Sequence, residues 1–470
     1  MSRTVLLLSA AALLAVGALA LGRPPPPPVT DTTHTVALPD EEAATEVLPT
    51  VASPETGALS LEGKLSGAWV HAGPSEAFAV LEVKAHAPQE RRRVPVNVAL
   101  VIDRSGSMRG QKLEDAKRAA RTFINRVSAE DRVALVHYGT DVTVFPSTLA
   151  TSEAREQMHV FVNAIEDSGS THISGGLEAA AQQLRDITGQ FRVSRIILLS
   201  DGQPTAGLTR EEQLTGLART LRSQGMAVSA LGVGEDFNEN LMQGIADQGG
   251  GFSGFLRSDQ LAEVFTRELE QATGTVARAV EVRLDLPPSV REVEVMGVSA
   301  VREGRTVRVP LYDMAGGQSA RLVVKLSLET KPSEHPQELL VSTVHYIDVE
   351  KDGPAQARVT LTARSTEDAQ VVRAHLDKDV RVHAHRALGT QQMRAAAEEM
   401  KKGNRQGALS LMGNARSLFG ASAAALAGDI AELDRSQAAY ESAQSASEQR
   451  QQARQLQNKS IKNFGQENSY

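Results

Sequence analysis

Residues 94–108 read VPVNVALVIDRSGSM, and this stretch decides the fold. From Val94 to Asp103 the chain is almost continuously apolar and rich in β-branched side chains, a pattern typical of a strand buried on both faces of a sheet. Asp103 ends the apolar run, and serines follow at Ser105 and Ser107. Because ligands bind at the carboxyl ends of strands in open α/β sheets, these three oxygen-bearing side chains stand where a binding site is expected.

Strand and helix patterns alternate after this stretch. The apolar strand patterns lie at residues 133–138, 193–200 and 226–233, and the helical patterns lie at 112–127, 152–166, 174–187, 210–223, 238–247 and 259–271. Strands separated by helices predict βαβ units, and therefore a parallel sheet with helices on both faces. We expect a doubly wound, Rossmann-like α/β domain over residues 94–273.

The hydrophobic period changes from 3.6 to 2 after residue 275. Alternating segments follow at residues 280–286, 306–309, 321–328, 341–347 and 357–361. This alternation is typical of half-buried antiparallel strands and predicts a small β-sandwich over residues 276–365. Strand-like residues 58–93 come before the α/β domain and do not fit its sheet. We expect them to pair with the β domain, so that the α/β domain is inserted in the sandwich or followed by it.

The amino-terminal part has the pattern of an export segment. Residues 1–21 have a basic start and an apolar run over residues 4–21, which predicts either a cleaved signal peptide or an uncleaved anchor. Under both interpretations the folded part lies outside the cytoplasm, in the periplasm or cell envelope, and an anchor would tether it to the inner membrane. Residues 22–57 include five consecutive prolines and no sustained period, so we expect a disordered linker there.

The carboxyl-terminal part has a helical pattern. We expect a helical region over residues 366–449, in which residues 406–412 resemble the second helix of a helical hairpin, although no 34-residue repeat is detectable. Gln, Ser and Asn dominate beyond this region, so residues 450–470 are predicted to form a disordered tail.

Composition excludes several classes of function. The chain has 57 acidic and 50 basic residues, which argues against a nucleic-acid partner, because such proteins normally present a basic face to the phosphates. It has no cysteine, which excludes a disulfide scaffold, thiolate zinc sites, iron–sulfur clusters and a cysteine nucleophile.

Three loops at one edge of the predicted sheet carry oxygen donors. The first holds Asp103, Ser105 and Ser107, the second holds Thr171 just before a helix, and the third holds Asp201 directly after the strand pattern at 193–200. Carboxylate and hydroxyl oxygens are hard donors that suit Mg²⁺, with Ca²⁺ or Mn²⁺ as alternatives. The pattern therefore predicts a divalent-cation site.

This arrangement, Asp-x-Ser-x-Ser followed by a distant threonine and a distant aspartate, resembles the metal-ion-dependent adhesion site of the von Willebrand factor type A (VWA) domain. The resemblance covers residues 94–273. Residues 232–239 and the glycines at 249–251 are similar to the bacterial subgroup related to inter-α-trypsin inhibitor heavy chains, and to proteins labelled calcium-activated chloride channel homologues.

The resemblance implies roles for the individual residues. In that family Ser105, Ser107 and often Thr171 contact the cation, Asp103 and Asp201 act directly or through water, and one coordination position is left for a carboxylate from a partner. A further residue, His172, stands where relatives commonly have asparagine, and we expect it to tune the loop without abolishing the site.

Together these features predict an exported, non-enzymatic module whose cation captures an Asp or Glu carboxylate of a partner protein. Two alternatives stay open. The first is a metal-dependent hydrolase, for which His137 or His172 would have to serve as general base. The second is a component of a membrane channel or transport assembly, which one apolar segment could not form in a monomer.

Overall fold

The computed structural model describes residues 51–52, 57–87, 93–187, 189–201, 203–234 and 238–465. The predicted export segment at 1–21 and most of the predicted linker at 22–57 lie outside these residues, as do residues 235–237 and 466–470. None of the helices in the described part of the chain is both long and apolar enough to cross a lipid bilayer.

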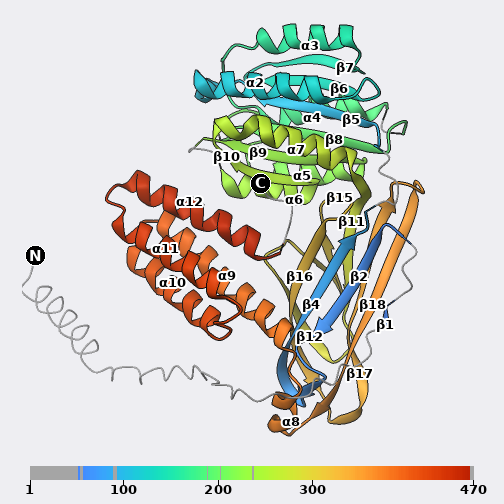
Figure 1. Ribbon diagram of the computed structural model, residues 1–470, viewed down its shortest axis with the longest axis vertical. Helices are drawn as coiled ribbons and strands as arrows, with labels where there is room; N and C mark the ends of the chain where they lie inside the picture. The colour runs from blue at the N-terminus through green and yellow to red at the C-terminus, as the bar shows by residue number, and fades with distance from the viewer. Residues whose placement is uncertain are drawn as a thin grey trace, which may run out of the picture. The chain divides into compact units, whose positions relative to one another are not determined.

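The α/β domain is built on a sheet with the strand order β10-β9-β8-β5-β6-β7 (Figure 1). These strands span β5 Val96–Asp103, β6 Arg132–Tyr138, β7 Val142–Leu149, β8 Val193–Ser200, β9 Met226–Val233 and β10 Gly250–Leu256. Strands β10, β9, β8, β5 and β6 are parallel to one another. The predicted doubly wound α/β fold is confirmed.

The predicted parallel sheet carries one antiparallel strand at its edge, because β7 pairs antiparallel with β6. Only residues 139–141 separate the two strands. A connection this short permits a hairpin, whereas a parallel partner needs a crossover of a dozen residues or more.

Alternate residues of β5 face two different cores. Leu100 and Ile102 pack with α2, α3 and α7 on one face of the sheet, whereas Ala99 and Val101 pack with α4, α5 and α6 on the other. The helices span α2 Gln111–Arg126, α3 Ser152–Asn163, α4 Ile173–Arg185, α5 Glu211–Ser223, α6 Glu239–Gly249 and α7 Leu261–Thr273. Both faces of β5 are therefore covered, as its apolar sequence requires. Its carboxyl end, at Asp103, leads into the loop that holds Ser105 and Ser107.

The β domain consists of two sheets packed on one hydrophobic core. One sheet has the order β1-β18-β17-β11-β14-β13, with β15 on β11 and β3 on β18, and the other has the order β12-β16-β4-β2. Its strands span β1 Val51–Ala52, β2 Leu59–Leu65, β3 Trp69–His71, β4 Gly73–Ala85, β11 Thr275–Asp285, β12 Val290–Met296, β13 Val301–Glu303, β14 Thr306–Pro310, β15 Met314–Ala315, β16 Ser319–Thr330, β17 Ser333–Asp348 and β18 Gly353–Thr366.

Strands from before and after the α/β domain share one sheet. β4 lies between β2 and β16 and pairs antiparallel with both, and its register with β16 runs from Gly73 opposite Thr330 to Lys84 opposite Ser319. This pairing is the one that an inserted α/β domain would produce. The domain limits drawn at 58–93, 94–273 and 276–365 stay a prediction.

Helices follow the β domain. They span α8 Ala369–Ala374, α9 Lys378–Lys401, α10 Arg405–Gly420, α11 Ala427–Ser442 and α12 Ala446–Asn463. The helical pattern that begins near Glu367 is broken before α9, where the side chain of Asp377 accepts a hydrogen bond from Val380 N (2.9 Å) and caps a new helix.

The predicted disordered tail over 450–470 is wrong for its described part, because α12 continues to Asn463. Ala453 and Leu456 are buried in the same core as residues of α9 and α10, and Phe464 packs against Met296 and Val323 of the β domain. The apolar side chains of this otherwise polar stretch are therefore the ones that pack on the rest of the chain.

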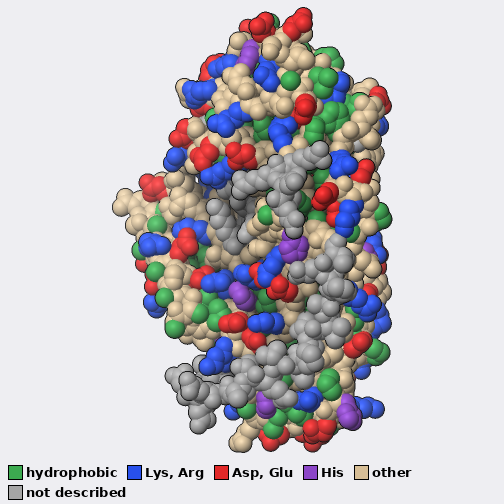
Figure 2. All heavy atoms as spheres, turned by 45° about the vertical axis from the view of Figure 1, so that its right-hand side comes forward, with side chains coloured by type: hydrophobic (Ala, Val, Ile, Leu, Met, Phe, Trp, Pro, Cys, Tyr) green, Lys and Arg blue, Asp and Glu red, His purple; other side chains and the backbone are tan. Residues whose placement is uncertain are grey.

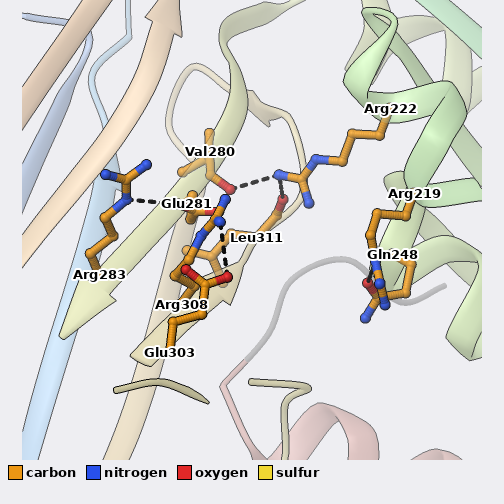
Figure 3. A network of polar contacts seen from close by, with 9 residues as sticks. All are labelled: Arg219, Arg222, Gln248, Val280, Glu281, Arg283, Glu303, Arg308 and Leu311. Atoms are coloured by element: carbon orange, nitrogen blue, oxygen red, sulfur yellow. Dashed lines mark hydrogen bonds and ion pairs between the residues drawn. The ribbon is translucent and has the colours of Figure 1, made fainter. Parts of the chain in front are cut away.

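Charged side chains are interspersed over the face drawn in Figure 2. A half-buried arginine joins the α/β domain to the β domain. Arg222, in α5, donates hydrogen bonds of 2.7 Å to the carbonyl oxygens of both Val280 and Leu311, while Arg308 pairs with Glu281 on the adjacent strand (Figure 3). The two hydrogen bonds of Arg222 attach the end of α5 to strand β11 and to Leu311, which directly follows β14.

Candidate metal centre

Two aspartates lie at the carboxyl ends of adjacent strands. Asp103 is the last residue of β5, Asp201 directly follows β8, and these strands pair in parallel with Ile102 opposite Leu199. Both carboxylates are fully buried. The sheet topology therefore brings together two acidic side chains that are almost a hundred positions apart in the sequence.

The carboxylate of Asp103 is held by hydrogen bonds to both of its oxygens. Ser105 N donates to Oδ1 (2.8 Å), and the Ser200 hydroxyl donates to Oδ2 (2.6 Å). An Asp side chain that accepts from the backbone two residues further on forms a local turn, which Asp-x-Ser sequences favour. Ser200 was not among the predicted site residues, because its contact depends on the register of β5 against β8.

Serine hydroxyls connect the two carboxylates. The hydroxyls of Ser105 and Ser107 lie 3.0 Å apart, and the Ser107 hydroxyl donates to Asp201 Oδ1 (2.7 Å). Ser105 is buried, whereas Ser107 is exposed. The structure thus brings four of the predicted residues into one cluster of oxygen donors that opens to solvent at Ser107.

The fifth predicted residue, Thr171, is attached to this cluster through its loop. Gly106 N donates to the carbonyl oxygen of Gly169 (3.3 Å), which places the Thr171 loop beside the first loop. On the other side, Thr171 O accepts from Thr205 N (3.0 Å), and Thr171 N donates to the Thr205 hydroxyl (2.8 Å). These contacts position the backbone of Thr171 and leave its role as a ligand a prediction.

The electrostatics of the cluster favour a cation. Burial raises the pKa of Asp103, the hydrogen bonds from Ser200 and Ser105 lower it, and the nearby charge of Asp201 raises it further. Burial, together with the charge of Asp103, also raises the pKa of Tyr138. Buried carboxylates that lie close together are costly to ionise unless a positive charge joins them.

The donor set fits a hard divalent cation. Within the described residues, no group of three or more His, Cys, Asp or Glu side chains gathers as a metal cluster. The predicted ligands of a cation at this cluster are the carboxylates of Asp103 and Asp201 and the hydroxyls of Ser105, Ser107 and Thr171. All of these are oxygen donors, which suit Mg²⁺, Ca²⁺ or Mn²⁺ better than softer metals.

A lysine that the sequence did not single out also contacts the cluster. Lys112 Nζ lies 2.6 Å from Asp201 Oδ2 and donates to the carbonyl oxygen of Ser107 (3.3 Å). Lys112 is the second residue of α2, and nothing in its sequence position distinguishes it from the neighbouring Arg104 and Arg109. Its contact could be found only from the three-dimensional structure.

The two histidines considered as general bases lie in different surroundings. His137, on β6, packs its ring against Phe161 (5.2 Å between centroids), and burial, assisted by the charge of Arg104, lowers its pKa to about 4. His172 immediately precedes α4, and a Cβ placed on Gly207 would lie 2.2 Å from its Nε2. The ring of His172 therefore packs closely against Gly207, and the neighbouring Thr205 and Ala206 form hydrogen bonds with Thr171.

Comparisons with known proteins identify the family of the α/β domain. Residues 97–267 match the family model of the von Willebrand factor type A domain, so this part of the chain is a VWA domain. Inter-alpha-trypsin inhibitor heavy chain H3 of Pongo abelii is 31% identical over 47% of this chain and 27% of that protein. The uncharacterized protein sll0103 of Synechocystis sp. is 25% identical over 71% of this chain and 80% of that protein.

The structural comparison extends beyond the VWA domain. A von Willebrand factor type A protein from Catenulispora acidiphila superposes with a TM-score of 0.66 and 19% identity, covering 82% of this chain and 91% of that one. At this identity the likeness shows the fold alone. The chain spans only about a quarter of the inter-alpha-trypsin inhibitor heavy chain that it matches.

Proposed function

We propose, from a chain that carries a VWA domain, that the protein is a non-enzymatic, divalent-cation-dependent protein-binding module with a role in adhesion or assembly. VWA domains commonly mediate metal-dependent protein binding. The cation, which we propose to be Mg²⁺, is held by Asp103, Ser105, Ser107, Thr171 and Asp201. Its partner is a protein that offers an Asp or Glu carboxylate.

The observation that carries this proposal is the pair of fully buried carboxylates linked through serine hydroxyls. Asp103 is oriented from both sides, by Ser105 N and by the Ser200 hydroxyl, so its position is set before any ligand binds. A preorganised ligand set of this kind reduces the entropy lost on binding.

The exposed residues of the first loop make the proposed site accessible to a partner. Gly106 and Ser107 face solvent, whereas Asp103, Ser105 and Asp201 are buried beneath them. When bound, a divalent cation would supply a Lewis-acid position for an incoming carboxylate. The chain's own residues hold that position at the surface and keep the two aspartates away from bulk water.

Cation binding is the first test of the proposal. Isothermal titration calorimetry with Mg²⁺ and Mn²⁺ should show one saturable site in the wild-type chain. Ser105→Ala removes a buried hydroxyl donor and should weaken the cation affinity by about tenfold or more. Ser223→Ala, which removes an exposed hydroxyl on α5, is the matched control and should bind as the wild type does. Equal affinities in wild type and Ser105→Ala would contradict the proposed ligand set.

Partner capture is the second test. A pull-down from an envelope extract with Mg²⁺ should retain a partner that is released by EDTA and not retained by Ser105→Ala. Retention in EDTA would overturn the metal-dependent part of the proposal, whereas cation binding without any cation-dependent partner would overturn the adhesion role.

We further propose that the protein is exported and acts in the periplasm or cell envelope, with residues 4–21 as signal peptide or membrane anchor. The support is the basic and apolar pattern of the first residues. Fractionation of cells that express the full chain, combined with mass spectrometry of its amino terminus, separates a cleaved signal peptide from a retained anchor. Recovery of the full-length chain in the cytoplasm would contradict export.

A further inference from the structure

Lys112 reaches from α2 into the cluster of oxygen donors. Its ammonium lies 2.6 Å from Asp201 Oδ2, while the other oxygen of the same carboxylate accepts a hydrogen bond from Ser107 (2.7 Å). The Asp201 side chain is fully buried, and that of Lys112 is 30% exposed. The pair is therefore partly shielded from water, so its charges interact more strongly than those of a surface pair.

The fold makes room for this lysine. Gly234, directly after β9, has a φ of +85°, and a Cβ placed on it would lie 2.9 Å from Cε and 3.1 Å from Nζ of Lys112. A glycine is favoured at this φ, and the absence of a side chain leaves the space that the ammonium fills. The lysine thus packs in a defined position and is not a freely moving surface chain.

The positive charge of Lys112 changes the net charge of the cluster. Asp103 and Asp201 together carry two negative charges, and the ammonium of Lys112 compensates one of them. A divalent cation bound to the two carboxylates alone would form a neutral unit, whereas with Lys112 the unit has a net charge of about +1. A carboxylate from a partner is attracted to the second unit more strongly than to the first.

We propose that Lys112 is a specificity-determining residue of the metal site, which weakens the hold on the cation and strengthens the capture of an acidic partner. The inference rests on the proposed function, because it concerns the same cation and the same partner carboxylate. It assigns opposite effects on the two binding steps to one side chain, and a purely structural role would not produce that combination.

The test uses Mn²⁺ as the cation and acetate as the carboxylate, with the full chain. Mn²⁺ affinity is measured by the electron paramagnetic resonance signal of the free ion. Acetate binding to the Mn²⁺-loaded protein is measured by the fall in water-proton relaxation as acetate displaces a metal-bound water. Neither measurement requires the natural partner to be known.

Three variants separate the charge of Lys112 from its other contributions. Lys112→Met removes the charge and keeps most of the volume. Lys112→Gln also removes the charge but keeps an N–H donor for Asp201. It can therefore replace Lys112→Met in the test if that variant does not fold. Arg121→Gln removes a positive charge from a half-buried side chain of the same helix, whose hydrogen bond to Asn163 is exposed, and is the matched control.

We expect Lys112→Met and Lys112→Gln to bind Mn²⁺ about tenfold more tightly than the wild type, and their Mn²⁺-loaded forms to bind acetate about fivefold more weakly. Arg121→Gln should leave both affinities within about twofold of the wild type, because a charge in an exposed contact is screened by solvent and salt.

The outcomes distinguish the two proposals. If neither the wild type nor the Lys112 variants bind Mn²⁺, the metal site itself is overturned, and the role of Lys112 with it. If all proteins bind Mn²⁺ equally, or if the variants bind it more weakly, the site stands and the role of Lys112 is overturned. Tighter Mn²⁺ binding without a loss of acetate affinity would also overturn the proposed effect on the partner.

Discussion

Two buried charged clusters lie along strand β8, and they accommodate burial in different ways. Near its start, Arg195 pairs with Glu268 of α7 (3.4 Å), and both side chains are fully buried. Just after its end, Asp201 lies near Asp103, and both are acidic. The first cluster contains both signs of charge, whereas the second contains an excess of negative charge next to an exposed loop.

The surroundings of the two clusters strengthen this contrast. Ser229 donates to Glu268 Oε2 (2.8 Å), and the guanidinium of Arg195 lies 5.4 Å from the ring centroid of Phe252, so that cluster is enclosed by protein groups. The Asp103 cluster is partly compensated by Lys112 and reaches solvent at Ser107. Burial of charge alone does not indicate a site. The excess of negative charge beside an exposed loop is what supports the proposed site at the Asp103 cluster.

The largest expected effect comes from breaking the enclosed pair. Arg195→Met removes the positive charge beside the buried carboxylate of Glu268 and should lower the free energy of unfolding by about 3–5 kcal/mol. The double variant Arg195→Met with Glu268→Met replaces the pair by apolar groups and should recover most of this loss. Urea unfolding measures both. If the double variant is as unstable as the single variant, the buried charge of Glu268 is not the cause of the lost stability.

Cation binding should stabilise the second cluster by a smaller amount. Mg²⁺ at about one hundred times its dissociation constant is expected to raise the free energy of unfolding by about 2.7 kcal/mol, since the folded chain alone presents the assembled site. Thermal unfolding with Mg²⁺ and with EDTA gives the difference. The same difference in Ser105→Ala, at the same Mg²⁺ concentration, would contradict a site at this cluster.

In contrast to the substitutions above, a substitution of Asp103 should make the metal-free protein more stable than the wild type. Because burial raises the pKa of Asp103, its ionised form destabilises the folded chain above its ordinary pKa. Asp103→Asn removes that charge and should raise the metal-free stability at neutral pH by about 1 kcal/mol, while the stabilisation by Mg²⁺ disappears. Chemical unfolding with and without Mg²⁺ tests both halves, and a strongly destabilised Asp103→Asn would contradict the argument.

Much of the fold could be predicted because the deciding patterns are local. The apolar runs at 193–200 and 226–233 coincide with β8 and β9. Strand β7 was missed because Pro146 and several polar residues interrupt its pattern, and because its pairing depends on a tight turn after β6. The helix α12 was missed because only a narrow apolar stripe, which includes Ala453 and Leu456, packs on the other helices.

The residues of the candidate site also fall into two groups: those that the local sequence indicates and those that only the three-dimensional structure reveals. Asp103, Ser105 and Ser107 lie on one loop, so their spacing alone indicated an oxygen-rich site. Ser200 and Lys112 could not be found in this way. The contact of Ser200 with Asp103 follows from the register of two strands, and the position of Lys112 depends on the space beside Gly234.

His137 is a third, half-buried polar group in the same sheet. Unlike the two charged clusters, it is neutral in the folded chain. With a folded pKa of about 4, against an ordinary value near 6.5, it stays neutral in the folded chain while the unfolded chain takes up a proton between these two pH values. Stability should therefore fall as the pH drops from about 6.5 toward 4, by about 1–2 kcal/mol after allowance for its partial exposure. His137→Leu should reduce that pH dependence, whereas His335→Leu, at an exposed position, should not. Unfolding by urea at pH 7 and pH 5 measures it. An unchanged pH dependence in His137→Leu would overturn the assignment of the acid sensitivity to this histidine.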